Sequence, residues 1–128
     1  MDVASGKARQ LTSGDLHVSG FSLSPDGKRI AFAGQPTPLI PDRYKSDIYV
    51  VAVSGGTPAP LVTLRGSDAS PSWSPDGRWV AFQSQDGRGD DWYTNDFLCV
   101  VPAAGGPVKN LTASFDESVG GLAGGRFV

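Results

Sequence analysis

The chain has 128 residues, of which 39% are hydrophobic and 19% charged, and its formal net charge is −2. This composition favours a packed structure over a disordered one, and the length allows one hydrophobic core without calling for two large domains. Basic residues are scattered along the chain, so we expect no nucleic-acid partner, because binding a phosphate backbone needs a basic stripe.

The amino-terminal residues show no export signal. Residues 1–6 lack a basic segment followed by an apolar stretch, so no secretory signal is predicted. No window is apolar over the length that a bilayer crossing requires, so we expect no membrane partner. We expect the chain as given to be soluble and favour the cytoplasm, while the compartment of a longer parent stays open.

A four-residue turn occurs twice, 50 residues apart. Proline presets φ near −65°, the aspartate side chain can bond backbone groups, and glycine takes the left-handed conformation that closes the turn. Each copy therefore predicts a hairpin with a type I turn and a bulge. The first copy is Ser24, Pro25, Asp26 and Gly27, and the second is Ser74, Pro75, Asp76 and Gly77.

Each turn belongs to a unit with four strand candidates. In the first unit they span residues 16–23, 28–34, 46–53 and 59–63, and in the second 69–73, 78–84, 95–101 and 108–112. A second phrase repeats at the same spacing, with glycines at positions 6, 56 and 106 and leucines at 11, 61 and 111. Four short strands in a repeat of about 50 residues are typical of one β-propeller blade.

The predicted fold class is therefore all-β, with antiparallel four-stranded β-propeller blades in an incomplete propeller. About two complete blades are expected, at residues 16–64 and 65–114, plus flanking strands. Residues 1–15 correspond to the end of a preceding blade. Residues 115–128 correspond to the start of a further, degenerate blade, in which Ala123 and Gly124 stand where the turn has proline and aspartate.

These motifs resemble those of a known family. The Ser-Pro-Asp-Gly turn followed by a basic residue and an apolar-Ala-Phe run, the strand at 47–51, and the Gly-Gly turn before Leu-Thr are similar to the WD-like repeats of TolB-type proteins. They also resemble the amino-terminal propeller of prolyl oligopeptidase family serine peptidases, in particular the acylaminoacyl-peptidase and dipeptidyl-peptidase-like branches. The similarity runs from residue 3 to about residue 117.

The resemblance implies a non-catalytic role. In these peptidases the propeller filters substrates, and the nucleophile belongs to a separate α/β-hydrolase domain. This sequence contains nothing similar to that domain, which would be a partner within the parent protein. The alternative is a self-standing, TolB-like interaction propeller that associates with copies of itself.

The residues themselves offer little for catalysis. No Gly-x-Ser-x-Gly nucleophile elbow occurs, and His17 is the sole histidine, on a predicted innermost strand. We expect His17 to line a channel or to pack between blades, and a small hydrolase built on it is the least favoured reading. Cys99 lies in an apolar run and is interpreted as a buried structural residue.

Two groups of loop residues are candidate binding sites. Asp86, Asp90 and Asp91 could offer oxygen ligands to calcium, but their spacing matches no EF-hand loop, so a solvated acidic loop is favoured. We therefore expect no metal and no cofactor. Trp92 and Tyr93, at the end of this loop, are candidates for an exposed contact.

The blades should also have surfaces that need partners. Phe32, Trp79 and Phe82 alternate with strand period and are expected to fill the space between sheets. Two blades leave sheet faces and edges uncovered. We therefore predict a homo-oligomer, formed through exposed blade faces or by exchange of terminal strands.

Overall fold

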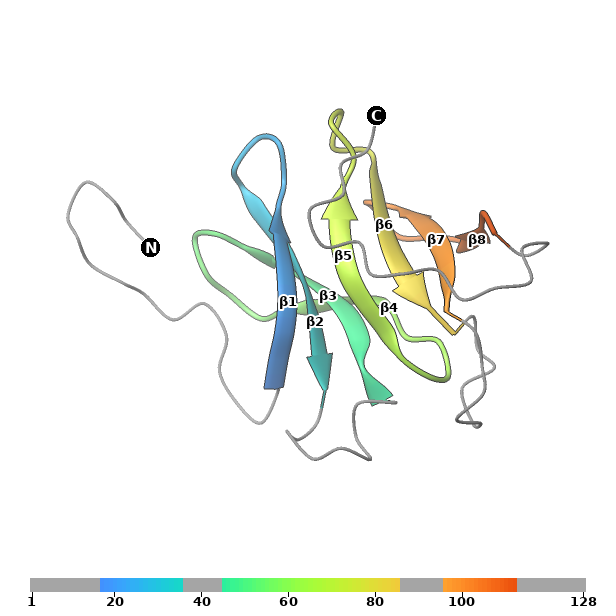
Figure 1. Ribbon diagram of the computed structural model, residues 1–128. Coiled ribbons are helices and arrows are strands. Elements are labelled where there is room, and N and C mark those ends of the chain that lie inside the picture. The colour runs from blue at the N-terminus through green and yellow to red at the C-terminus, as the bar shows by residue number, and fades with distance from the viewer. Residues whose placement is uncertain (1–16, 36–44, 86–95, 113–128) are drawn as a thin grey trace.

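The computed structural model describes residues 17–35, 45–85 and 96–112, which form two four-stranded antiparallel sheets (Figure 1). The strands of each sheet are neighbours in chain order, as in a propeller blade. The first sheet contains β1 (His17–Leu23), β2 (Arg29–Gln35), β3 (Asp47–Ala52) and β4 (Ala59–Val62). The second contains β5 (Asp68–Trp73), β6 (Trp79–Ser84), β7 (Phe97–Pro102) and β8 (Lys109–Asn110).

The expected fold class is confirmed. All eight strand candidates are present, and their ends lie within two residues of the expected positions. Within the described ranges there is no helix long and apolar enough to cross a membrane. The segments assigned to a preceding blade, 1–15, and to a further blade, 115–128, lie outside the described residues.

The two repeated turns close the β1–β2 and β5–β6 hairpins. In the first, the Gly27 amide donates to the Ser24 carbonyl at 2.9 Å, and the Ser24 amide donates to the Arg29 carbonyl at 2.8 Å. The glycine has a φ of +71° in both turns, a conformation that other residues rarely adopt. The hairpins predicted from these four-residue turns are thus confirmed.

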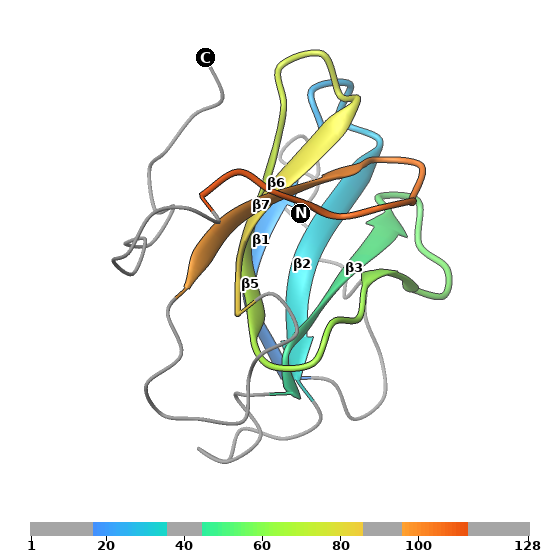
Figure 2. The ribbon, with the colours of Figure 1, turned by 90° about the vertical axis from the view of Figure 1, so that its right-hand side faces the viewer.

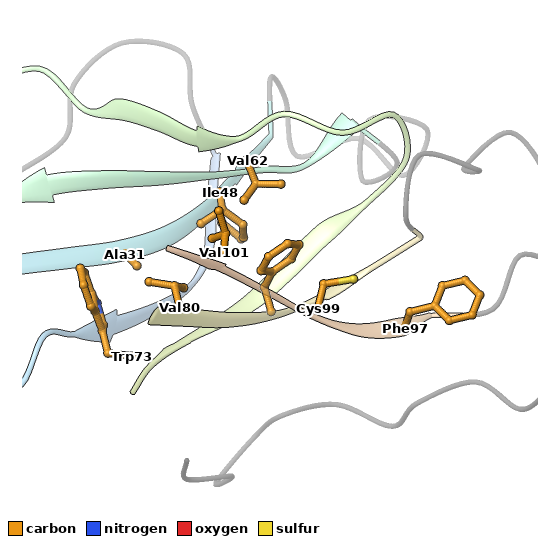
Figure 3. Packing of buried hydrophobic residues seen from close by; sticks show 10 residues of the cluster. Ala31, Ile48, Val62, Trp73, Val80, Phe97, Cys99 and Val101 are labelled. Carbon is orange, nitrogen blue, oxygen red and sulfur yellow. The ribbon is translucent and has the colours of Figure 1, made fainter. Parts of the chain in front are cut away.

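The hydrophobic core lies between the two sheets, which stack face to face (Figure 2). Phe82 pairs with Cys99, and Val80 with Val101, so that these side chains share one face of the second sheet. Cys99 is fully buried there, as a structural cysteine should be. The core consists of Ala31, Ala33, Ile48 and Val62 from the first sheet and Trp73, Val80, Phe82, Phe97, Cys99 and Val101 from the second (Figure 3).

The aromatic residues correct one expectation. Phe82 fills the space between the sheets as predicted, whereas Phe32 stacks on Tyr49, with ring centroids 5.5 Å apart, and is not part of that core. Trp79 is 40% exposed. Because neighbouring residues of a strand point to opposite faces, and Val80 points into the core, Trp79 points away from the first sheet.

Candidate functional site

The serine and aspartate of each repeated turn hold the turn in shape. The Ser24 hydroxyl donates to Asp26 Oδ1 at 2.6 Å, and the Lys28 amide donates to the same oxygen at 3.0 Å. The Arg29 amide in turn donates to Ser24 Oγ at 3.0 Å. The second turn repeats these three bonds at the same distances, so both polar side chains are engaged in local structure.

The hydrogen bonds lower the pKa of the turn aspartates. The pKa of Asp26 and of Asp76 lies below the usual 3.8. The hydrogen bond from the serine hydroxyl is the largest cause, and the bond from the backbone amide two residues after the aspartate is the next. Two other carboxyl groups behave oppositely. Burial raises the pKa of Asp47 at the start of β3 and of Asp96 just before β7, although Gln83 donates a hydrogen bond to Asp96.

These shifts predict that stability passes through a maximum on the acid side. Asp26 and Asp76 stabilise the fold above their unfolded-state pKa of 3.8, and this contribution is lost as the pH falls below it. Asp47 and Asp96 disfavour the fold when charged, and protonation relieves that cost as the pH falls towards 3.8. Thermal unfolding between pH 7 and pH 2 should therefore show a rise before the fall.

Two variants separate the contributions. Replacing both Asp26 and Asp76 with Asn should flatten the loss below pH 3.8. Asp47→Asn is the matched control, since it should reduce the rise and leave the acid loss in place. If the double variant lost as much thermal stability below pH 3.8 as the wild-type protein does, Asp26 and Asp76 would not be the cause of that loss.

Asp68, at the start of β5, joins the two sheets. It is fully buried, and its carboxylate accepts bonds from the Ser84 hydroxyl at 2.6 Å and from the Leu64 amide at 3.1 Å. Its backbone is paired as well. The Asp68 amide donates to the Ser46 carbonyl at 2.8 Å, and the Ser46 hydroxyl donates to the Asp68 carbonyl at 2.8 Å. Asp68 thus ties the second sheet to the start of β3 in the first.

Trp73, at the other end of β5, makes a second connection. Its indole Nε1 donates to the Ser22 carbonyl at 2.9 Å, and its backbone amide donates to Ser22 Oγ at 3.3 Å. The Arg29 guanidinium lies 4.8 Å from the centroid of the indole ring, which places a cation over an aromatic face. Trp73 is 6% exposed and also belongs to the core.

We call this contact the blade seam. It is formed by Ser22, Arg29 and Ser46 on the first sheet and by Asp68 and Trp73 on the second. Strand alternation and turn motifs do not single out Asp68 or Trp73. The two repeats differ at these positions, because the first blade has Val18 and Leu23 where the second has Asp68 and Trp73. This difference could have pointed to a special role for Asp68 and Trp73.

The other candidate residues are placed as follows. His17 is exposed at the start of β1, opposite Gln35 in the ladder, so it is not packed between the two described blades. The calcium candidates Asp86, Asp90 and Asp91 and the contact candidates Trp92 and Tyr93 lie outside the described residues. Among the residues that are described, no group of three or more His, Cys, Asp or Glu side chains is placed to bind a metal ion.

Sequence comparison finds relatives among peptidases. No protein-family profile matches the chain. The uncharacterised peptidase YuxL of Bacillus subtilis is 33% identical over 97 residues, which cover 76% of this chain and 14% of YuxL. Dipeptidyl-peptidase 5 of Porphyromonas gingivalis is 31% identical over 107 residues, covering 80% of this chain and 15% of the peptidase. The chain therefore spans about one seventh of the length of these relatives.

Solved structures resemble the fold. A TolB protein of Agrobacterium tumefaciens has a TM-score of 0.58 and 28% identity over 76% of this chain and 30% of its own. TolB of Acinetobacter baumannii has a TM-score of 0.69 and 22% identity over 93% of this chain and 26% of its own. The β-propeller domain of the trilobed protease of Pyrococcus furiosus has a TM-score of 0.52 and 15% identity over 78% of this chain and 28% of its own.

The Acinetobacter and Pyrococcus structures, at 22% and 15% identity, show a likeness of fold alone. The Agrobacterium protein is similar to this chain in sequence as well, at 28% identity. The two four-stranded antiparallel sheets of this chain agree with that likeness of fold. The chain therefore has the fold of β-propeller blades like those of TolB, and its sequence is similar to parts of two peptidases.

Proposed function

We propose that the chain is a non-catalytic β-propeller segment of a prolyl oligopeptidase family serine peptidase, in which it supports the scaffold around substrate entry. The observation that carries the proposal is the similarity to two peptidases, which extends over more than three quarters of this chain and over about one seventh of each relative. The matched region is thus made of propeller blades, and the remaining length of a relative leaves room for a separate catalytic domain.

The structure suits a scaffold role. The two sheets are fixed to each other by a shared apolar core and by the buried bonds of the blade seam. Loops on a rigid scaffold are where recognition concentrates. The β2–β3 and β6–β7 connections, the second of which carries Trp92 and Tyr93, are the segments we assign to substrate contact.

An activity assay tests the proposal. The chain is incubated with acyl-peptide and proline-containing chromogenic substrates and with a fluorophosphonate probe that labels activated serines. We expect no turnover and no labelling, because the sequence lacks a nucleophile elbow. A rate that is removed by the serine probe, or by His17→Ala, would overturn the non-catalytic assignment.

A TolB-like interaction propeller is the second candidate. It is favoured by the Agrobacterium TolB structure, which shares both fold and 28% of its aligned sequence with this chain. The reading frame that follows residue 128 in the parent gene distinguishes the two. A downstream Gly-x-Ser-x-Gly elbow selects the peptidase, and a parent without one selects the interaction propeller.

A further inference from the structure

The exposed apolar side chains of the protein gather on two surfaces. Within residues 17–35, 45–85 and 96–112, the large hydrophobic residues that are exposed are five in number. Three lie on β1: Val18 is 37% exposed, Phe21 75% and Leu23 55%. The other two belong to the second blade, where Trp79 is 40% exposed and Leu111 48%.

The β1 residues correspond to buried residues of the second blade. A shift by the 50-residue repeat maps β1 onto β5, the strand that forms one side of the blade seam. Leu23 corresponds to Trp73, which donates to Ser22 and lies against Arg29. Val18, Phe21 and Leu23 therefore occupy the positions of Asp68, Pro71 and Trp73, all of which are buried.

The second surface corresponds to the other side of the seam. The same shift maps Arg29, which lies over the Trp73 ring, onto Trp79, and it maps Ser22 onto Ser72. Leu61, which packs against the core between the sheets, maps onto Leu111. The seam positions of Ser22, Arg29 and Trp73 thus recur as Ser72, Trp79 and Leu23, whereas those of Ser46 and Asp68 are taken by Asp96 and Val18.

We propose that these two surfaces bind each other between two copies of the chain, head to tail. The β1 surface (Val18, Phe21 and Leu23) of one copy covers the β6 surface (Ser72, Trp79 and Leu111) of the next, in the geometry of the blade seam. The proposal concerns the 128-residue chain by itself, since neighbouring blades of a longer parent would take the place of the second copy. The assembly would place Leu23 of one copy beside Trp79 of the other, as Trp73 lies beside Arg29 within the chain.

The side chains at the two surfaces fit this arrangement. Within the chain the seam contact combines an arginine and a tryptophan, whereas the corresponding contact between copies combines a tryptophan and a leucine. Leu23 and Trp79 are both apolar, so their contact removes exposed hydrophobic surface from water, whereas Asp96, in the place of Ser46, brings a carboxylate to the same interface. The blade seam also shows how two such sheets can stack, because the first blade already packs on the second in this way within the chain.

Head-to-tail contacts also limit the size of the assembly. A heterologous interface forms a ring where its rotation closes, and known propellers close with about four to eight blades. A chain that contributes two blades should therefore form rings of roughly two to four copies. Light scattering coupled to size-exclusion chromatography should give a mass in this range for the wild-type chain.

Two variants on opposite surfaces provide the decisive test. Leu23→Asp blocks the β1 surface and Trp79→Asp blocks the β6 surface, and each alone should weaken association by roughly thirtyfold, as loss of a central interface residue does. Each variant retains one intact surface. An equimolar mixture should therefore form a one-to-one complex that grows no further, which neither variant forms alone.

The controls separate this model from other kinds of association. Thr57→Asp adds the same charge at an exposed turn outside both surfaces and should leave the mass unchanged. Leu111→Asp, on a 48% exposed side chain, replaces Trp79→Asp if that variant loses its far-ultraviolet circular dichroism spectrum. A monomeric wild-type chain would overturn the proposal, and so would an assembly that Leu23→Asp abolishes and the β6-surface variants leave intact, since that pattern indicates β1 packing on β1.

Discussion

Replacing Asp68 with Ala is expected to lower the free energy of unfolding by about 3 kcal/mol and the thermal midpoint by roughly 10 °C. The substitution removes the acceptor of the Ser84 hydroxyl, in a buried bond, and of the Leu64 amide, in a partly buried one. A donor that loses its acceptor in a buried site costs about 1–3 kcal/mol, because water cannot replace the lost bond. Two such donors set the expected magnitude.

Urea and thermal unfolding followed by circular dichroism measure this effect. At a protein concentration below that at which copies associate, Val18→Ala is the matched control, since Val18 holds the same place in the first blade and is 37% exposed. We expect that control to change the unfolding free energy by about 0.5 kcal/mol or less, as surface substitutions usually do. A thermal midpoint of Asp68→Ala equal to that of Val18→Ala would show that the buried carboxylate contributes nothing to the seam.

The strands and hairpins could be predicted because their causes are local. The Ser-Pro-Asp-Gly turn contains its own hydrogen-bond donors and acceptors, and both copies form the same bonds within six residues of chain. Strand alternation similarly depends on neighbouring positions alone. Recurrence at one spacing then indicates stacked blades, which the two sheets confirm.

The blade seam could not be predicted in the same way because its partners are distant in the sequence. The indole of Trp73 meets Ser22 across 51 positions, and Ser46 meets Asp68 across 22. A strand pattern states which residues share a face but not which face has a neighbour. That is why the prediction was right for Phe82, whose face meets the first sheet, and wrong for Trp79, whose face does not.

Trp73→Ala is expected to lower the unfolding free energy by about 4 kcal/mol, and Trp73→Phe by about 1–2 kcal/mol. Alanine removes the ring that fills the core and lies against Arg29, together with the indole bond to the Ser22 carbonyl. Phenylalanine keeps an aromatic ring and loses the bond. At a protein concentration below that at which copies associate, the control is Leu23→Ala at the same position of the first blade, where the side chain is 55% exposed and the loss should stay below about 1 kcal/mol.

The width of the urea unfolding transition shows whether the two blades unfold together, which its midpoint does not. In stacked repeats, stability is the sum of the units and of the interfaces between them, so weakening an interface lets one unit unfold before the other. Trp73 belongs to the seam, and its loss should broaden the urea transition as well as shift it, whereas Leu23→Ala should do neither. Equal losses for Trp73→Ala and Trp73→Phe, with an unbroadened transition, would mean that the ring does not couple the blades and that the apolar core alone joins them.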